Sequence, residues 1–558
     1  MEPEPEGHGR AGVGSVPAVG ERGDRDDALR IGRRSFMAGV VAVVAAAACS
    51  SGDDGGDGDS DGGGDGDGRA ADLPPVPDDL GAEVFALGVA SGDPRSDSVI
   101  LWTRLVADPT VPDGAIGTAE PVPVAWEVAT DEAFDDVVAE GTSVADQALG
   151  HSVHVDATGL EPDTWYWYRF TVDDRTSPAG RARTTPDDGD EPDTLRFAFA
   201  SCQNRQDGFW TAHDHLAEED VDLVLFLGDY IYEGPPEPES LQPYATPAPT
   251  DLPGYRARWA EYKADPALQA GHAARPWVCT WDDHEVGNDY ADDVAFGMAP
   301  DDEPSRERFL TQRAAAYQAF YEHQPVRLDP PDGPDLRIYR TLGWGTLARF
   351  YVLDGRQYRS DQGCGATAVV AGAGPLCPEA ERDDRTMLGA DQEAWLGDEL
   401  AASDARWNVL AQQTVVAHVP FAADLVNLDQ WDGYPAARGR LVDQLAGVAN
   451  PVVITGDIHL AAAGTIESAP GQPVAAELVG TSISSSFPLA DAIEGLVAEL
   501  PNVQHINAHQ RGYVVCEVTA DELRADFRVV STVAEREATV ETDVSLVIAD
   551  GDPVPRLA

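Results

Sequence analysis

Short runs that alternate apolar and polar residues recur from about residue 82 and predict β-strands. Examples are "SVILWTRL", "VPVAWEVAT", "HSVHVDATGL" and "TWYWYRFTV", each bounded by turn residues. A period of two turns one face of a strand toward a core and the other toward solvent. Strands at this spacing are typical of an antiparallel β-sandwich. We therefore predict a β-sandwich module over residues 82–185.

A second pattern follows a Pro/Asp-rich linker at about residues 183–194. Apolar runs such as "LRFAFASCQ", "RFYVLDGRQYRS" and "WNVLAQQTVV" now alternate with two helix-like segments, "SRERFLTQRAAAYQAFYEH" and "GADQEAWLGDELAAS". Strands separated by helices are typical of a layered α/β domain. We place that domain at residues 194–540, so the expected fold class is α/β with a β-sandwich before it.

Several of the apolar runs end in side chains that commonly bind metal ions. Ligand sites in α/β sheets lie just outside the carboxyl ends of the strands. A single such residue usually belongs to an ordinary turn, and "WDDHE" alone also fits a solvated acidic loop. Their appearance at four strand ends favours one shared site. The residues are Cys202, Asp229, Tyr232, Asp282, Asp283, His284, Glu285, Asp457 and His459.

The residue types in this set indicate the kind of ion. Carboxylates and a phenolate are hard ligands, whereas a thiolate and an imidazole favour a transition metal. The mixture predicts either one mixed-ligand transition metal or that metal beside a calcium-like ion. Asp229 is well placed to bridge two ions. Two bridged metals lower the pKa of a shared water and hold phosphoryl oxygens for in-line attack.

The first 80 residues predict a targeting segment and a tether. Arg33 and Arg34 precede a short apolar run that ends at Cys49, which resembles the twin-arginine (Tat) signal of a bacterial lipoprotein. That run is too short for a comfortable membrane span, and a chance alanine-rich helix is the alternative. Residues 1–49 would be the signal, and the Gly/Asp-rich residues 50–80 a flexible tether. We expect the protein to be exported. It would then either be held at the membrane only by a lipid on Cys49, or be secreted.

The charge balance excludes one class of partner. The chain has 558 residues, 98 acidic against 38 basic, a formal net charge of −60, and a single lysine, Lys263. Nucleic-acid binding needs a basic surface, so we expect none, and we expect a monomer. Strong acidity suits high salt or surface cations, and codon bias is the alternative cause.

Cys364 and Cys377 are plausible disulfide partners outside the cytoplasm, and Cys279 and Cys516 lie in apolar runs that predict burial.

Several motifs resemble those of the PhoD family of alkaline phosphatases and phosphodiesterases. They are "GDYIYE", "WDDHEVGND", "YVLDGRQYRSDQ", "LGADQEAWL", "GDIHLAA" and "ELVGTSISS", and "FALGVASGDPRSDSVILWTRL" resembles the start of the family's N-terminal module. The resemblance runs from about residue 83 to at least residue 530. It implies a calcineurin-like metallophosphatase fold, in which two β-sheets lie between helices, preceded by an immunoglobulin- or fibronectin III-like domain.

The same resemblance implies a ferric ion with calcium ions. Cys202, Asp229, Tyr232 and His459 would hold the iron, and Asp229 would bridge to calcium. Asp457 and either Asp282 or Asp283 would be calcium ligands, and the sequence leaves that choice open. The resemblance also implies contacts to the substrate phosphate. His284 would act as leaving-group acid or transition-state stabiliser, with Asn204, Arg205 and Arg356 as further phosphate contacts. For Arg356 the alternative is a structural ion pair.

The expected function is therefore that of an exported, metal-dependent phosphoesterase. It would hydrolyse phosphomonoesters, phosphodiesters or both through a metal-activated hydroxide. A phospholipase D-like phosphodiesterase on the same scaffold is the alternative within this class. A non-catalytic surface protein that uses calcium for stability is the alternative outside it.

Overall fold

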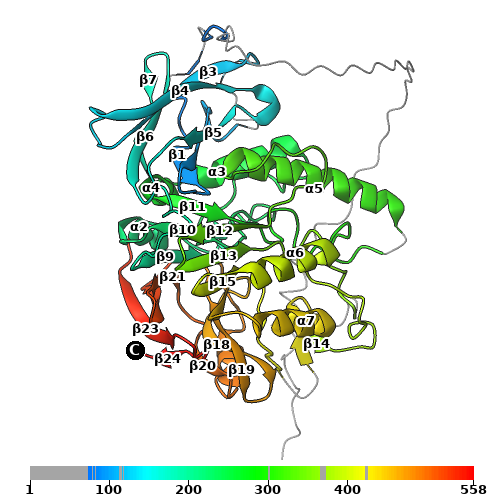
Figure 1. Ribbon diagram of the computed structural model, residues 1–558. Coiled ribbons are helices and arrows are strands. Elements are labelled where there is room, and N and C mark those ends of the chain that lie inside the picture. The colour runs from blue at the N-terminus through cyan, green and yellow to red at the C-terminus, as the bar shows by residue number, and fades with distance from the viewer. Residues whose placement is uncertain are drawn as a thin grey trace, which may run out of the picture. The chain divides into compact units, whose positions relative to one another are not determined.

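Two large β-sheets carry most of the core (Figure 1). A computed structural model describes residues 73–77, 80–81, 83–111, 116, 118–299, 302–364, 373–421 and 425–558. Ten strands form the first sheet, in the order β24 (Arg556–Leu557), β23 (Val540–Ala549), β22 (Glu522–Val530), β21 (Arg511–Val518), β9 (Leu195–Ala200), β10 (Leu223–Phe226), β11 (Pro276–Cys279), β1 (Val89–Gly92), β2 (Ser98–Arg104) and β5 (Ser152–Thr158). Seven strands form the second, in the order β12 (Arg340–Trp344), β13 (Ala348–Val352), β15 (Trp407–Ala411), β17 (Pro451–Thr455), β19 (Gln472–Val479), β18 (Ala461–Ala469) and β20 (Val503–Asn507).

The two sheets pack face to face, and helices cover their outer faces. Phe197 of β9 meets Phe350 of β13 edge to face, with ring centroids 5.1 Å apart, inside one continuous apolar cluster. Because both faces are covered, central strands such as β10, β11 and β17 are buried at every position instead of alternating. The helices are α2 (Thr211–Glu218), α3 (Leu252–Lys263), α4 (Pro266–Ala274) and α5 (Glu303–His323) over the first sheet, and α6 (Gly389–Ala402) and α7 (Pro435–Leu445) over the second, with α8 (Ala490–Val497) in a later loop.

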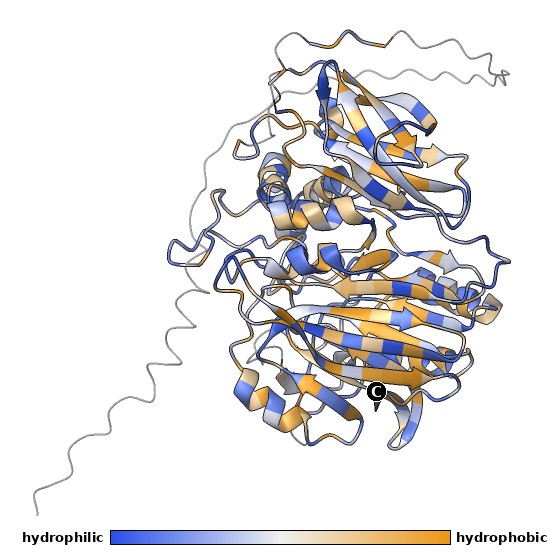
Figure 2. Cartoon of the chain, turned by 90° about the vertical axis from the view of Figure 1, so that its left-hand side faces the viewer, coloured by the Kyte–Doolittle hydropathy of each residue, from blue (hydrophilic) through white to orange (hydrophobic). Residues whose placement is uncertain are grey.

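The N-terminal strands serve two sheets. A five-stranded sheet contains β4 (Val137–Ala145), β3 (Val122–Ala129), β6 (Trp165–Val172), β7 (Arg175–Thr176) and β8 (Gly180–Arg183). Along β6 every second side chain is buried, and Figure 2 shows hydrophilic and hydrophobic residues interleaved along the strands in the upper part of the molecule. By contrast β1, β2 and β5 extend the ten-stranded sheet, where Ser91 of β1 lies opposite Pro276 of β11.

The predicted strands and helices are present, and the mixed α/β class is confirmed. All four alternating runs form strands, namely β2, β3, β5 and β6, and the two helix-like segments form α5 and α6. The immunoglobulin-like and calcineurin-like assignments and the domain boundaries stay predictions. A short pair, β14 (Ala373–Pro375) with β16 (Leu425–Asn427), and two 3-10 turns at Gln147–Leu149 and Trp431–Gly433 complete the elements of the described residues.

Parallel pairing brings the carboxyl ends of six strands together. In the first sheet β9, β10 and β11 are parallel neighbours, and in the second sheet β13, β15 and β17 are. A bridge between Ser201 and Ser482 joins the loops of the two sheets. The residues that follow these strand ends therefore meet in one place.

The single lysine is buried. Lys263 ends α3, is 1 % exposed, and lies with its Nζ 3.1 Å from Nε2 of His272. Its ammonium group lies over the rings of Trp102 and Tyr230, at 4.6 Å and 5.2 Å from their centroids. Burial lowers the pKa of Lys263 to about 7, because an apolar environment disfavours the charged form.

The cysteines outside the strand ends lie where the sequence predicts. Cys364 and Cys377 form a disulfide, and Cys279 and Cys516 are buried free thiols. The predicted signal, Cys49 and most of the tether lie outside the described residues, so the export prediction stays open. Within the part of the chain that the structure describes, no helix has the length and apolar character to cross a membrane.

A buried carboxylate in β19 gives the fold a pH dependence. Glu477 accepts hydrogen bonds from the backbone N–H groups of Val416 and Ala417, at 2.6 Å and 2.8 Å, and burial raises its pKa to about 7. The native carboxyl group holds its proton more tightly than the same group in the unfolded chain. It therefore stabilises the fold at pH values below its unfolded pKa, and this contribution is lost as the pH rises through 7.

We therefore expect the free energy of unfolding to fall by about 1–3 kcal/mol more between pH 5 and pH 8 in the original protein than in Glu477→Gln, because glutamine does not ionise. Glutamine offers one acceptor oxygen to the two N–H groups, so the variant should lose stability at both pH values, but by less near pH 8. Urea unfolding at the two pH values measures this, with exposed Glu499→Gln as the control. A glutamine that destabilises equally at both pH values would contradict it.

Candidate metal centre

Four of the predicted ligands occupy left-handed backbone turns. The φ angles are 58° at Cys202, 55° at Asp229, 62° at Asp457 and 57° at His459. Residues other than glycine rarely adopt positive φ, and such conformations cluster at functional sites, where the surrounding structure enforces them. Each turn comes directly after a buried strand. The fold therefore holds these four side chains on rigid, strained turns.

A thiol, a phenol, an imidazole and a carboxylate meet at the ends of β9, β10 and β17. Ligand atoms of Cys202, Asp229 and His459 lie within 4.8 Å of one another. The hydroxyl of Tyr232 donates to Oδ2 of Asp229 at 2.9 Å and lies 3.1 Å from Nε2 of His459. Nδ1 of His459 donates to the carbonyl of Ser486 at 2.9 Å, which leaves Nε2 as the free lone pair facing the group.

Burial sets the protonation of this group in the absence of a cation. It raises the pKa values of the Cys202 thiol, the Tyr232 phenol and the Asp229 carboxyl well above their ordinary values. It lowers the pKa of His459 to about 4, so that this imidazole is neutral. A cation that binds here must displace protons from the oxygen and sulfur ligands.

Two further groups of potential ligands continue the site without a break. Asp229, Asp283 and His284 form a second group of potential ligands, and Asp282, Asp283 and Asp457 form a third. The first and second groups share Asp229, and the second and third share Asp283. Oδ2 of Asp282 and Oδ1 of Asp283 are buried without a hydrogen-bond partner within the described residues. Buried orphan oxygens are costly, and bound cations would satisfy them.

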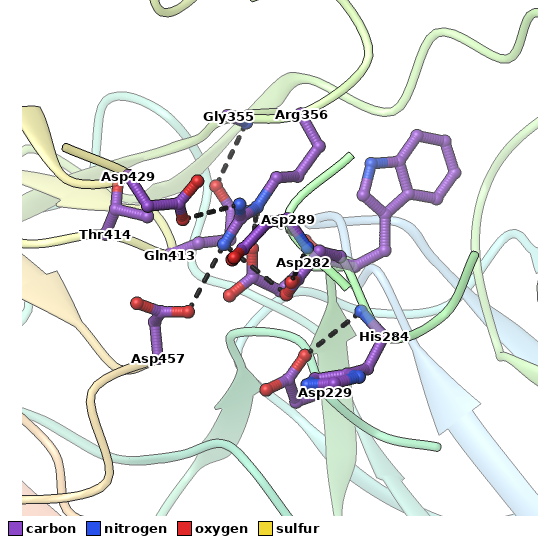
Figure 3. A network of polar contacts seen from close by, with 12 residues as sticks. Asp229, Asp282, His284, Asp289, Gly355, Arg356, Gln413, Thr414, Asp429 and Asp457 are labelled. Atoms are coloured by element: carbon purple, nitrogen blue, oxygen red, sulfur yellow. Dashed lines mark hydrogen bonds and ion pairs between the residues drawn. The ribbon is translucent and has the colours of Figure 1, made fainter. Parts of the chain in front are cut away.

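Arg356 lies in the middle of the third group (Figure 3). Its guanidinium donates to Oδ1 of Asp282, to Oδ2 of Asp429 at 2.8 Å and to Oδ1 of Asp457 at 3.2 Å. Oδ1 of Asp283 lies 3.4 Å away. The side chain is fully buried. The structure thus shows Arg356 in carboxylate ion pairs, and its role as a phosphate contact stays a prediction.

His284 is held by a carboxylate that sequence analysis missed. Nδ1 of His284 donates to Oε2 of Glu233 at 2.7 Å, and Oε1 of Glu233 accepts from the Asn288 N–H at 2.8 Å. The His284 ring also stacks on Tyr232, with centroids 4.1 Å apart. Burial lowers the pKa of His284, but the carboxylates of Glu233 and Asp229 raise it more, to well above its ordinary value. The clue in the sequence was a second carboxylate in "GDYIYE".

Glu285, which the sequence placed beside the ligands without a role, ties two strand ends together. Its carboxylate accepts from the backbone N–H groups of Asp229, Tyr230 and Asp282, at 3.1 Å, 2.5 Å and 2.9 Å. Burial raises the pKa of Glu285 to about 7. One side chain therefore fixes the turn after β10 against the turn after β11.

Asn204 lies at the edge of the site, next to the ligand group. Its Oδ1 accepts from the Tyr244 hydroxyl at 3.0 Å, and its own N–H donates to Ser485 at 3.0 Å. The side-chain carbonyl is thereby occupied, and the amide NH₂ is the end available for an anion. Arg205 lies 3.6 Å from Glu261 and over the ring of Trp210, so the structure pairs it away from the ligands.

This architecture is that of an α/β protein with a candidate polynuclear metal site at the ends of its strands. The chain belongs to the PhoD-like phosphatase family. The sequence model of that family matches residues 197–527, and the model of its N-terminal domain matches residues 71–186.

Two known proteins resemble the chain over most of its length. Alkaline phosphatase D from Bacillus subtilis (strain 168) is 45% identical over 481 residues, which cover 83% of this chain and 80% of that protein. A solved structure described as "Structure of PhoD" is 42% identical, with a TM-score of 0.80, and the match covers 87% of this chain and 93% of that one.

Gly228, directly before Asp229, is required by a close approach. Its φ is +107°, and a Cβ added there would lie 2.4 Å from the backbone nitrogen of Asp282. We expect Gly228→Ala to lower the free energy of unfolding by about 2–4 kcal/mol, because the two ligand turns must separate. Gly471, at φ +74° with open space around it, supplies a control in which alanine costs only about 1 kcal/mol of backbone strain. Chemical denaturation of both variants measures the difference, and equal losses would contradict the close-approach explanation.

Proposed function

We propose that the protein is a metal-dependent phosphoesterase. The observation that carries the proposal is the chain of three ligand groups linked through Asp229 and Asp283. Membership of the PhoD-like phosphatase family supports hydrolysis of phosphate esters as the reaction. The calcineurin-like arrangement of two sheets between helices and the immunoglobulin-like N-terminal module belong to the same proposal.

The residues present fit the expected ions. Cys202, Asp229, Tyr232 and His459 offer sulfur, oxygen and nitrogen ligands that suit Fe³⁺. The carboxylates of the third group offer only oxygen, which suits Ca²⁺. We propose Asp283 as a ligand alongside Asp282, because each has a buried oxygen without a hydrogen bond. When bound, such ions activate water as a nucleophile and neutralise phosphoryl charge.

The protein side chains would orient the ester and move a proton. Nδ1 of His284 is occupied by Glu233, so its Nε2 is the atom that can face a substrate and donate a hydrogen to the leaving-group oxygen. The Asn204 NH₂ would hold a phosphoryl oxygen. Arg356 would fix the positions of the carboxylates and contribute positive charge beside the phosphate.

Metal content and turnover together test this proposal. Purified protein should contain iron and calcium and hydrolyse p-nitrophenyl phosphate, bis-p-nitrophenyl phosphate or both. We expect Asp229→Asn to lower turnover by at least about 100-fold and to lose bound metal, since Asp229 belongs to two of the three ligand groups. Exposed Asp404→Asn should change neither. Full turnover in metal-free Asp229→Asn protein would refute the proposal, and the ratio of the two substrates separates monoesterase from diesterase.

Glu233 should act as a positioning residue for His284. Glu233→Gln keeps the shape and an acceptor for the Asn288 N–H, but removes the charge that orients the imidazole. We expect kcat to fall by about 10–100-fold, with KM nearly unchanged. The pH profile of kcat should shift as well, whereas the metal content should not. A loss of metal instead of a shifted profile would assign Glu233 a structural role.

A further inference from the structure

A second pocket lies apart from the metal centre, between the end of β1, strand β12 and helix α6. Its volume is about 390 Å³, within the range of small-molecule sites. Four of its eleven lining residues are arginines, namely Arg95, Arg327, Arg337 and Arg340. Such a concentration stands out in a chain with a net charge of −60. None of the lining residues belongs to the three ligand groups.

Two of these arginines are held by hydrogen bonds and ion pairs within the protein. Arg340 donates to Oδ1 of Asp93 at 2.6 Å and to the carbonyl of Cys279 at 3.1 Å. Arg327 donates to the carbonyl of Asp93 and lies 2.5 Å from Asp156. Asp93 is the one carboxylate among the lining residues. Because Arg340 compensates the negative charge of Asp93, this carboxylate does not repel an anion from the pocket.

The other two arginines are available to a ligand. Arg95 and Arg337 are exposed, and within the described residues neither forms an ion pair with a carboxylate. The Arg337 guanidinium lies over the Tyr339 ring, 4.3 Å from its centroid, which orients it without using its hydrogen-bond donors. Guanidinium groups bind phosphate and carboxylate through paired N–H donors.

An aromatic wall stands beside these charges. Tyr339 and Trp395 line the pocket, with ring centroids 4.9 Å apart, and Trp395 is partly exposed. Flat rings stack on exposed indole faces. The pocket therefore combines anion donors with a stacking surface.

We propose that this pocket binds an organic phosphate that carries a planar ring, such as a nucleotide. The phosphate would lie between Arg95 and Arg337, and the ring would lie against Trp395. The ligand is held and not hydrolysed here, because no ligand group of the metal centre reaches the pocket. The site is thus separate from the phosphoesterase site and does not depend on its assignment.

Fluorine NMR of the full chain labelled with 5-fluorotryptophan can test this directly. Trp395→Phe assigns the Trp395 resonance. The probe is the methylene phosphonate analogue of AMP, which has no ester oxygen to hydrolyse, and inorganic phosphate is the second probe. The pocket variant is Arg95→Ala with Arg337→Ala. The control removes equal charge elsewhere, through Arg382→Ala with Arg556→Ala, both exposed.

We expect the AMP analogue to shift the Trp395 resonance saturably. In the pocket variant, the Kd for the analogue should rise by at least about tenfold. The control variant should bind like the original protein, and inorganic phosphate should bind more weakly. A Trp395 resonance that stays in place while other tryptophans shift would overturn the proposal. So would equal Kd values in the two double variants. Inorganic phosphate that binds as tightly as the analogue would overturn the assignment to a ring-bearing ligand.

Discussion

The burial of several carboxylates around one guanidinium is the constraint on which the rest of the structure depends. Asp282, Asp283, Asp429 and Asp457 come from three different segments and converge on Arg356. Removing so many like charges from water is costly unless opposite charge compensates them. Arg356, with Arg359 beside Asp429, supplies two positive charges against four carboxylates, and Oδ2 of Asp282 and Oδ1 of Asp283 are left without a hydrogen bond. The protein therefore keeps a local excess of negative charge that cations would complete.

Holding such a cluster requires a rigid frame, and the two sheets provide it. The candidate ligands follow buried strands that are packed on both faces, so each turn starts from a fixed position. Glu285 then ties two of these turns to each other through three backbone hydrogen bonds. The left-handed φ angles at four ligands are tolerated because the packing leaves no alternative.

Local pattern was sufficient to predict the strands, the two named helices and the side chains that meet at the strand ends, because each of these side chains directly follows an apolar run. It could not predict that β1 pairs with β11, since their partners Ser91 and Pro276 are far apart in sequence. The partners of the ligands were also missed. Glu233 and Asp429 resemble the many other acidic residues of this chain, and only their burial and contacts distinguish them, while Glu285 was named without its role. Arg356 illustrates the same limit, because an isolated arginine in a sequence does not reveal its partners.

The burial of Lys263 has a practical consequence for the chemistry of the folded protein. It is the only lysine, and it lies beneath the rings of Trp102 and Tyr230. The native surface therefore carries no side-chain primary amine, so reagents such as activated esters and amine cross-linkers find no lysine while the fold is closed. Acylation of this residue would report transient opening of the core around α3, so the rate of acylation measures local unfolding without an added label.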